Sequence, residues 1–224
     1  MNWILRKKRL KAWAKAHSVA VPSGFNVLVP KCGKSCTILI ARVQKKAWGP
    51  GYVTGTWSPR MTALVAPAAS FNVRALRVAK GELGVKEHPA GSNDGPRVHE
   101  FQRETGAFSA PWCASFVAWS YEQVGHGLSG FNTAYVPSYV EAARAGRHRL
   151  RAINAGQARP GDLVCFDWEG DGTSDHIGIL NSRVTGNSFT SVEGNTSVGN
   201  DSNGGEVMLR SRLLGSVSCF IRVT

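Results

Sequence analysis

The chemistry of this 224-residue chain is most visible at one cysteine near a predicted helix start. Cys113 follows Pro111 and Trp112, and a proline at this point is typical of the first turn of a helix. The unpaired N–H groups and positive dipole end of such a turn stabilise a thiolate and can hold an oxyanion. We therefore predict that Cys113 is a nucleophile for acyl transfer rather than a residue of the core.

A thiol that is mostly protonated at neutral pH needs a nearby base, and the candidate is His176. His176 begins a predicted buried strand directly after an acidic, glycine-containing loop. The next predicted strand runs into Glu193-Gly194-Asn195. If the two strands are neighbours, Glu193 or Asn195 reaches the second imidazole nitrogen and orients the ring, as the third member of a triad does.

The elements that must position these residues predict an α+β fold. Four segments have the apolar spacing of helices, at 73–83, 97–105, 112–124 and 137–145. Five later segments alternate with period two and indicate strands, at 163–166, 176–180, 189–192, 207–209 and 219–223. Helices followed by strands are typical of helices packed on an antiparallel sheet. Cys165 and Cys219 fall inside strand patterns, so we expect them in the core.

Charge divides the chain into two parts. The net charge is +12, yet residues 1–81 contain 15 Lys or Arg and no Asp or Glu. We predict a basic, mainly helical domain at 1–68 and a catalytic domain at 71–224, joined near Pro67-Ala68-Ala69-Ser70. The asymmetry indicates an anionic partner for the first domain, and nucleic acid, anionic lipid and anionic wall polymer all fit it.

The first domain contains two helical patterns. Trp3, Leu10 and Trp13 share one face of a basic helix, which either touches a membrane or wall surface or begins an ordinary small domain. Residues 43–65 resemble the three-helix peptidoglycan-binding module of wall hydrolases, with a Val-Gln helix, a glycine turn, and a last helix starting at Ser58. A small helical domain without that ligand is the alternative.

The chain has five cysteines, and an odd number argues against a fully paired disulfide framework. Cys32 and Cys36 could pair or bind metal, but a structural zinc site needs four ligands and only His17 is available besides. We therefore expect free or loosely paired thiols there. Asp94, Asp171 and Asp175 lack the spacing of a calcium loop, so we predict no metal and no cofactor.

Five short motifs in the second part together resemble the CHAP domain, the cysteine, histidine-dependent amidohydrolase/peptidase family, whose fold is papain-like. The motifs, in chain order, are Ser92-Asn93-x-Gly95-Pro96, Pro111-Trp112-Cys113-Ala114-x-Phe116-Val117, Gly161-Asp162-Leu163-Val164, Asp175-His176-Ile177-Gly178-Ile179 and Glu193-Gly194-Asn195. The resemblance extends from about Val73 to Thr224 and covers about two-thirds of the chain.

The resemblance implies a role for each matching residue. Cys113 would be the nucleophile, with its own backbone N–H in the oxyanion hole, and His176 would be the base. Glu193 would orient His176, and Asn195 would assist that orientation or the oxyanion site. Three further residues would bind substrate or shape the cleft: Trp112, Asn93 and Asp175.

The function implied by the resemblance is that of a peptidoglycan hydrolase, an amidase or endopeptidase that cleaves an amide of the stem or cross-bridge peptide. The charged N-terminus lacks the apolar stretch of a secretory signal, and no apolar run approaches the roughly 20 residues of a membrane span. We therefore expect an endolysin-like monomer that stays in the host cytoplasm until a holin releases it. Its partners would be peptidoglycan and, through residues 1–68, anionic wall polymers, without nucleic acid or stable membrane insertion.

Two alternatives remain open. The protein could bind nucleic acid or membrane through its basic N-terminal region, although no recognised DNA-reading element or RNA motif is present. It could also be a tail-associated or bacterial wall-remodelling hydrolase, which would use the same chemistry.

Overall fold

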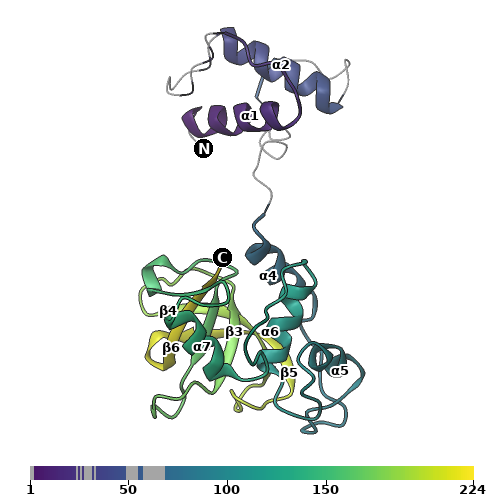
Figure 1. Ribbon diagram of the computed structural model, residues 1–224, viewed down its shortest axis with the longest axis vertical. Helices are drawn as coiled ribbons and strands as arrows, with labels where there is room; N and C mark the ends of the chain where they lie inside the picture. The colour runs from purple at the N-terminus through teal and green to yellow at the C-terminus, as the bar shows by residue number, and fades with distance from the viewer. Residues whose placement is uncertain are drawn as a thin grey trace. The chain divides into compact units, whose positions relative to one another are not determined.

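The computed structural model describes residues 3–23, 25, 27, 32, 34–48, 55–57 and 69–224 (Figure 1). The chain forms two compact units, Met1–Ala68 and Ala69–Thr224. The division falls inside the Pro-Ala-Ala-Ser segment at residues 67–70. In the described part of the chain, every helix is too short or too polar to cross a membrane.

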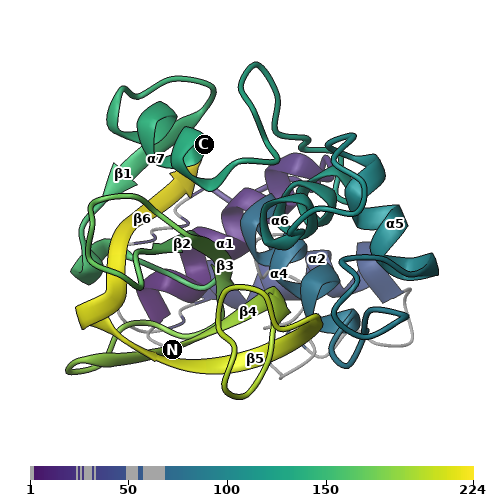
Figure 2. The same cartoon turned by 90° about the horizontal axis from the view of Figure 1, so that it is seen from below.

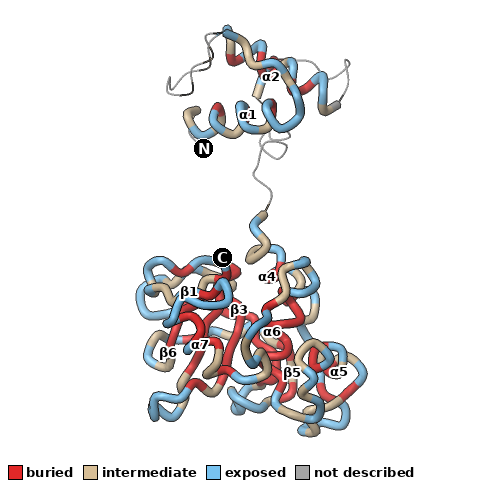
Figure 3. Tube along the Cα trace, viewed as in Figure 1, coloured by how far each residue is buried: buried red, intermediate tan, exposed pale blue. Residues whose placement is uncertain are grey.

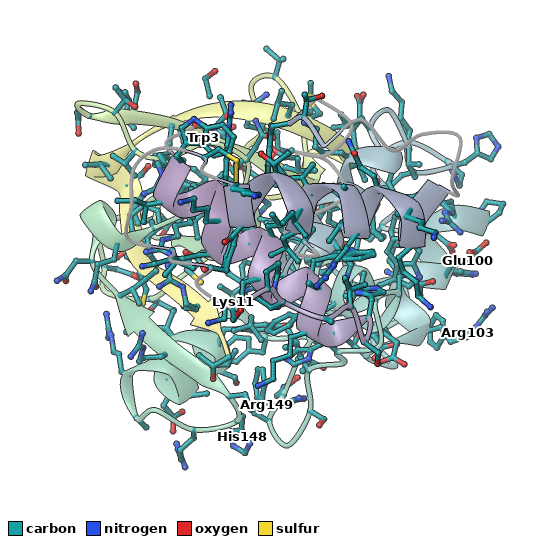
Figure 4. The ribbon with its side chains drawn as sticks, turned by 90° about the horizontal axis from the view of Figure 1, so that it is seen from above. Trp3, Lys11, Glu100, Arg103, His148 and Arg149 are labelled. Atoms are coloured by element: carbon teal, nitrogen blue, oxygen red, sulfur yellow. A yellow bond between two sulfur atoms is a disulfide. The ribbon has the colours of Figure 1, made fainter. Side chains whose placement is uncertain are left out.

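The N-terminal unit pairs two helices, α1 (Trp3–Ala16) and α2 (Lys34–Trp48). Leu10 of α1 is fully buried against α2, and Trp3 and Trp13 pack against the same cluster. Figure 4 labels Trp3 and Lys11 at separate points of α1; Trp3 packs on the buried cluster, whereas Lys11 is exposed and belongs to the basic surface. The predicted aromatic face therefore builds the interior of a small domain, which favours the ordinary-helix interpretation.

Two contacts organise the rest of this unit. Cys32 and Cys36 form a disulfide with a Cα–Cα distance of 5.3 Å, so of the alternatives that the sequence left open for this pair, free or paired, the structure has the pair. The buried Gln44 amide of α2 accepts the Gly55 N–H at 2.9 Å and donates to the Thr56 carbonyl at 3.0 Å. The helix predicted to start at Ser58 lies outside the described residues.

The C-terminal unit contains a six-stranded sheet in which all neighbouring strands are antiparallel. Its strands are β1 (Leu150–Ile153), β2 (Leu163–Phe166), β3 (His176–Leu180), β4 (Ser188–Thr196), β5 (Glu206–Leu213) and β6 (Val217–Val223). Their order across the sheet is β1-β6-β2-β3-β4-β5. The sequence pattern did not indicate β1, because that strand has four residues and only the first is buried.

The helices of this unit begin where local chemistry favours a start. They are α4 (Phe71–Gly81), α5 (Pro96–Arg103), α6 (Cys113–Glu122) and α7 (Val136–Arg144). The Ser70 hydroxyl caps α4 by accepting the Val73 N–H at 3.3 Å. Pro96 and Pro137 stand in the first turns of α5 and α7, where a missing N–H is tolerated.

Helix α6 is the centre of the packing. Its residues from Cys113 to Tyr121 are all buried, as the continuous red segment in Figure 3 shows. It lies over β3 and β4, α4 and α5 flank it, and α7 covers β1 and β6 (Figure 2). The opposite face of the sheet carries a second apolar cluster, made of Ala158, Val164, Phe166, Leu180, Phe189 and Phe220. The predicted α+β class with helices on an antiparallel sheet is confirmed.

One glycine sets how closely α6 approaches the sheet. A Cβ on Gly194 of β4 would lie 2.7 Å from the Trp112 ring and 2.9 Å from Phe116. Both rings are fully buried, so neither can move away without disturbing the core. The absence of a side chain at Gly194 therefore lets the N-terminus of α6 lie directly against β4.

We predict that Gly194→Ala lowers the free energy of unfolding by about 1–3 kcal/mol, because overpacking a dense core forces side chains off their rotamers. Chemical denaturation of the full chain measures this change. Gly156→Ala is the matched control, because a Cβ there meets no atom within 4 Å. Equal stability of the two variants would contradict the proposed close packing.

Candidate active site

Cys113 is the first residue of α6, and Trp112 is the N-cap. No side chain caps this helix start, so the first-turn N–H groups remain available to another acceptor. Cys113, a residue that is 4% exposed, therefore lies at the positive end of the helix dipole. The position therefore suits a nucleophile whose carbonyl adduct carries negative charge.

His176 and Glu193 come from neighbouring strands, which was the condition for the predicted contact between them. Strand β3 pairs with β4 in a register that sets Gly178 opposite Glu193. A Cβ on Gly178 would lie 2.6 Å from the Glu193 Cγ. Because glycine has no side chain, Glu193 has room to extend across Gly178 to the His176 imidazole. The Glu193 Oε2 lies 3.1 Å from His176 Nε2, and both side chains are fully buried.

The imidazole lies between this carboxylate and the Cys113 thiol. Burial alone lowers the pKa of His176, but the charge and hydrogen bonding of Cys113, followed by those of Glu193, raise that pKa to about 9. Within residues 69–224, Nδ1 of His176 has no hydrogen-bond partner of normal geometry. With Nε2 committed to Glu193, Nδ1 is the nitrogen left to exchange a proton with the thiol.

Sequence reasoning missed the residue that holds the carboxylate. Arg212 on β5 donates from Nε and Nη2 to the two Glu193 oxygens, at 2.9 and 2.5 Å. Burial raises the pKa of Glu193, but hydrogen bonds from Arg212 and His176 and their charges lower it to about 2. Arg212 also contacts Asp201 at 2.7 Å, and Ser191 donates to Glu193 Oε1.

Aromatic rings shield this chain of charges from water. The Trp168 ring centroid lies 4.7 Å from the Arg212 guanidinium carbon and 6.2 Å from the His176 ring. Phe166 stacks on Trp168 with centroids 4.6 Å apart. A cation over aromatic faces is itself stabilised, and the reduced solvent access strengthens the ion pair beneath.

A cavity of about 320 Å³ opens beside Cys113. Its walls come from the segment before α6, the start of α7 and the loop before β3. Asp175 lines it, as the predicted substrate role requires, but the Asp175 Oδ2 already accepts the Trp168 N–H at 2.7 Å. A substrate amide could therefore reach the thiol through this opening. The Asp175 carboxylate beside it already accepts one hydrogen bond from the loop before β3.

Three other residues predicted for the site contact neighbouring parts of the protein instead of lining the cavity. Trp112 is fully buried and donates from Nε1 to Glu87 at 2.8 Å, so it anchors the helix start and cannot touch substrate. The Asn93 carbonyl accepts from Gln102 at 2.9 Å, in the loop before α5 and outside the walls of the cavity. The Asn195 amide binds Asn203 and Gly205, which ties the end of β4 to the loop before β5 rather than to the imidazole.

The described residues contain no group of three or more His, Cys, Asp or Glu side chains arranged to hold a metal ion. Cys165 and Cys219 are buried free thiols, paired in register on β2 and β6. Burial raises the pKa of both thiols, which makes them poor nucleophiles at neutral pH.

Comparison with known proteins shows which family this chain resembles. Residues 105–195 match the CHAP domain, a range that includes Cys113, His176 and Glu193. A Bacillus subtilis (strain 168) protein, YhbB, itself described as uncharacterized, is 31% identical over 77 residues; the match covers 34% of this chain and 22% of that relative.

Among solved structures, a Staphylococcus aureus protein described as similar to lipoprotein, of the NLP/P60 family, is 14% identical with a TM-score of 0.38. The alignment covers 97% of this chain and 75% of that chain and is a remote likeness. By the match at residues 105–195, the C-terminal unit is similar to the CHAP domain, of the cysteine, histidine-dependent amidohydrolase/peptidase family.

Proposed function

We propose that the protein is a peptidoglycan hydrolase that cleaves an amide bond of the stem or cross-bridge peptide through Cys113, His176 and Glu193. The observation that carries the proposal is the buried series of thiol, imidazole and carboxylate at an uncapped helix start beside an open cavity. A series of this kind is the arrangement that acyl transfer to cysteine needs. The endolysin-like setting belongs to the same proposal.

The reaction would run in two halves. His176 takes the proton of Cys113, and the thiolate attacks the amide carbonyl to form a tetrahedral adduct. The N–H groups at the start of α6 stabilise its oxyanion. The imidazolium then protonates the leaving amine, and water, deprotonated by the same ring, hydrolyses the thioester.

The charges behind the ring support this sequence of proton transfers. An imidazole with a pKa of about 9 keeps the proton taken from Cys113 until the leaving amine receives it. Arg212 keeps Glu193 ionised by lowering the pKa of that carboxyl to about 2. Glu193 therefore acts as a fixed negative charge that positions His176 over the whole neutral range.

We predict that Cys113→Ala abolishes release of soluble fragments from purified Gram-positive walls, with at least a thousandfold loss, because no nucleophile remains. The variant should still fold and still pellet with walls at low salt through the basic residues of 1–68, and high salt should release it. Turbidity loss and wall pelleting measure the two properties. Clearing at the wild-type rate by the variant would exclude the mechanism.

We predict that wall hydrolysis declines as pH rises through about 9. The pKa of His176 is raised above the ordinary value of about 6.5, so the ring holds its proton at neutral pH and loses it only near 9. In Cys113→Ala the ring should titrate at a lower pH, because the thiol contributes to the raised pKa. Histidine NMR titration of both proteins tests this; an unchanged His176 titration would contradict the thiol–imidazole contact.

We predict that Arg212→Met lowers the free energy of unfolding by about 3–5 kcal/mol, because it leaves the Glu193 charge buried without its main partner. Adding Glu193→Gln should recover part of that loss, since no unpaired charge remains. Activity should stay low in the double variant, where no anion orients His176. Additive stability changes, measured by denaturation, would argue against the ion pair.

A further inference from the structure

The cavity beside Cys113 continues into a second hollow of about 600 Å³. The two hollows share four lining residues, Tyr135, Pro137, Thr173 and Ser174. Together they form a groove that follows α7 from its first turn, near Cys113, to its last. Tyr135 is 54% exposed at the junction and offers a ring and a hydroxyl to a chain lying in the groove.

Arg144 stands at the far end of this groove, in the last turn of α7. Its side chain is exposed, and no carboxylate of the described residues forms an ion pair with it. The one acid beside it in the groove, Glu141, is instead paired with Arg147 at 2.9 Å. The positive charge of Arg144 also opposes the effect of burial on the pKa of the Cys219 thiol.

The length of α7 fixes the scale of the groove. An α-helix rises about 1.5 Å per residue, so Val136 beside the catalytic cavity and Arg144 lie about 12 Å apart along the axis. An extended peptide covers about 3.3 Å per residue, so this length corresponds to three or four residues. A guanidinium at that distance can form two parallel hydrogen bonds with a carboxylate.

We propose that Arg144 binds a carboxylate of an acidic peptide whose scissile amide lies at Cys113, near the other end of the groove. The inference rests on the proposed function and names the substrate class that the same site accepts. Arg144 is a specificity-determining residue in it, remote from the reacting atoms. It acts on ground-state binding, so its loss raises KM and leaves kcat nearly unchanged.

The test uses the full chain and soluble fragments of purified wall, half of them treated with carbodiimide and ammonia so that their peptide carboxylates become amides. Wild type should show a KM about five- to tenfold lower on the untreated fragments, the size of one solvent-accessible charge-assisted contact. Arg144→Gln should lose that preference by weakening binding only to the untreated fragments. Arg144→Lys should keep part of it, because the charge remains without the planar fork.

Arg103→Gln is the matched control. Arg103 is an exposed arginine in the last turn of α5, and Figure 4 shows its side chain directed away from the unit. This variant should retain the wild-type preference. Retention of the preference by Arg144→Gln, or its equal loss in Arg103→Gln, would overturn the carboxylate site while hydrolysis itself continued. Absence of cleavage of both substrates by folded wild type would instead refute the proposed function, and this inference with it.

Discussion

A carboxylate with no access to water is the constraint around which the C-terminal unit is organised. Glu193 is fully buried, and an unpaired charge in that position would cost several kcal/mol. Arg212 donates hydrogen bonds to both Glu193 oxygens, and His176 contacts one of these oxygens. Three adjacent strands, β3, β4 and β5, must therefore keep their register for the charges to remain paired.

This pairing gives the site its electrostatic character. Because Arg212 keeps Glu193 ionised, the carboxylate in turn supports a protonated His176. Trp168 and Phe166 lie over the guanidinium and exclude water from the pair, which preserves the strength of each interaction. The Glu193 carboxylate therefore orients the imidazole, while the Cys113 thiol and Glu193 together raise the pKa of the ring.

The second requirement is a close approach between helix and sheet. The thiol belongs to α6 and the imidazole to β3, so their distance depends on how tightly the two layers pack. Gly194 allows the contact with Trp112 and Phe116, and Gly178 leaves room for the Glu193 side chain. The groove along α7 begins beside Cys113, so the packing that places Cys113 at the sheet also positions one end of the groove.

Much of this arrangement was predictable from the sequence, because it rests on local patterns. A proline before Cys113 marked the helix start, and period-two runs gave the bounds of β2 and β3. The motifs also singled out His176 and Glu193 as partners, and these two side chains lie 3.1 Å apart in the structure. Local signals of this kind act over a few residues and leave a visible trace in the order of residue types.

Other features depended on pairings between distant segments. Arg212 lies 19 residues from Glu193 in a strand without a motif, and only the β4–β5 register brings them together. Burial turned Trp112 from an expected substrate contact into an anchor for the helix, and the Asn195 amide bound a neighbouring loop. The sequence by itself determined which residues could react and which elements carry them. The tertiary structure decided which charges are buried together, because burial and pairing depend on how strands and helices pack rather than on the spacing of residues along the chain.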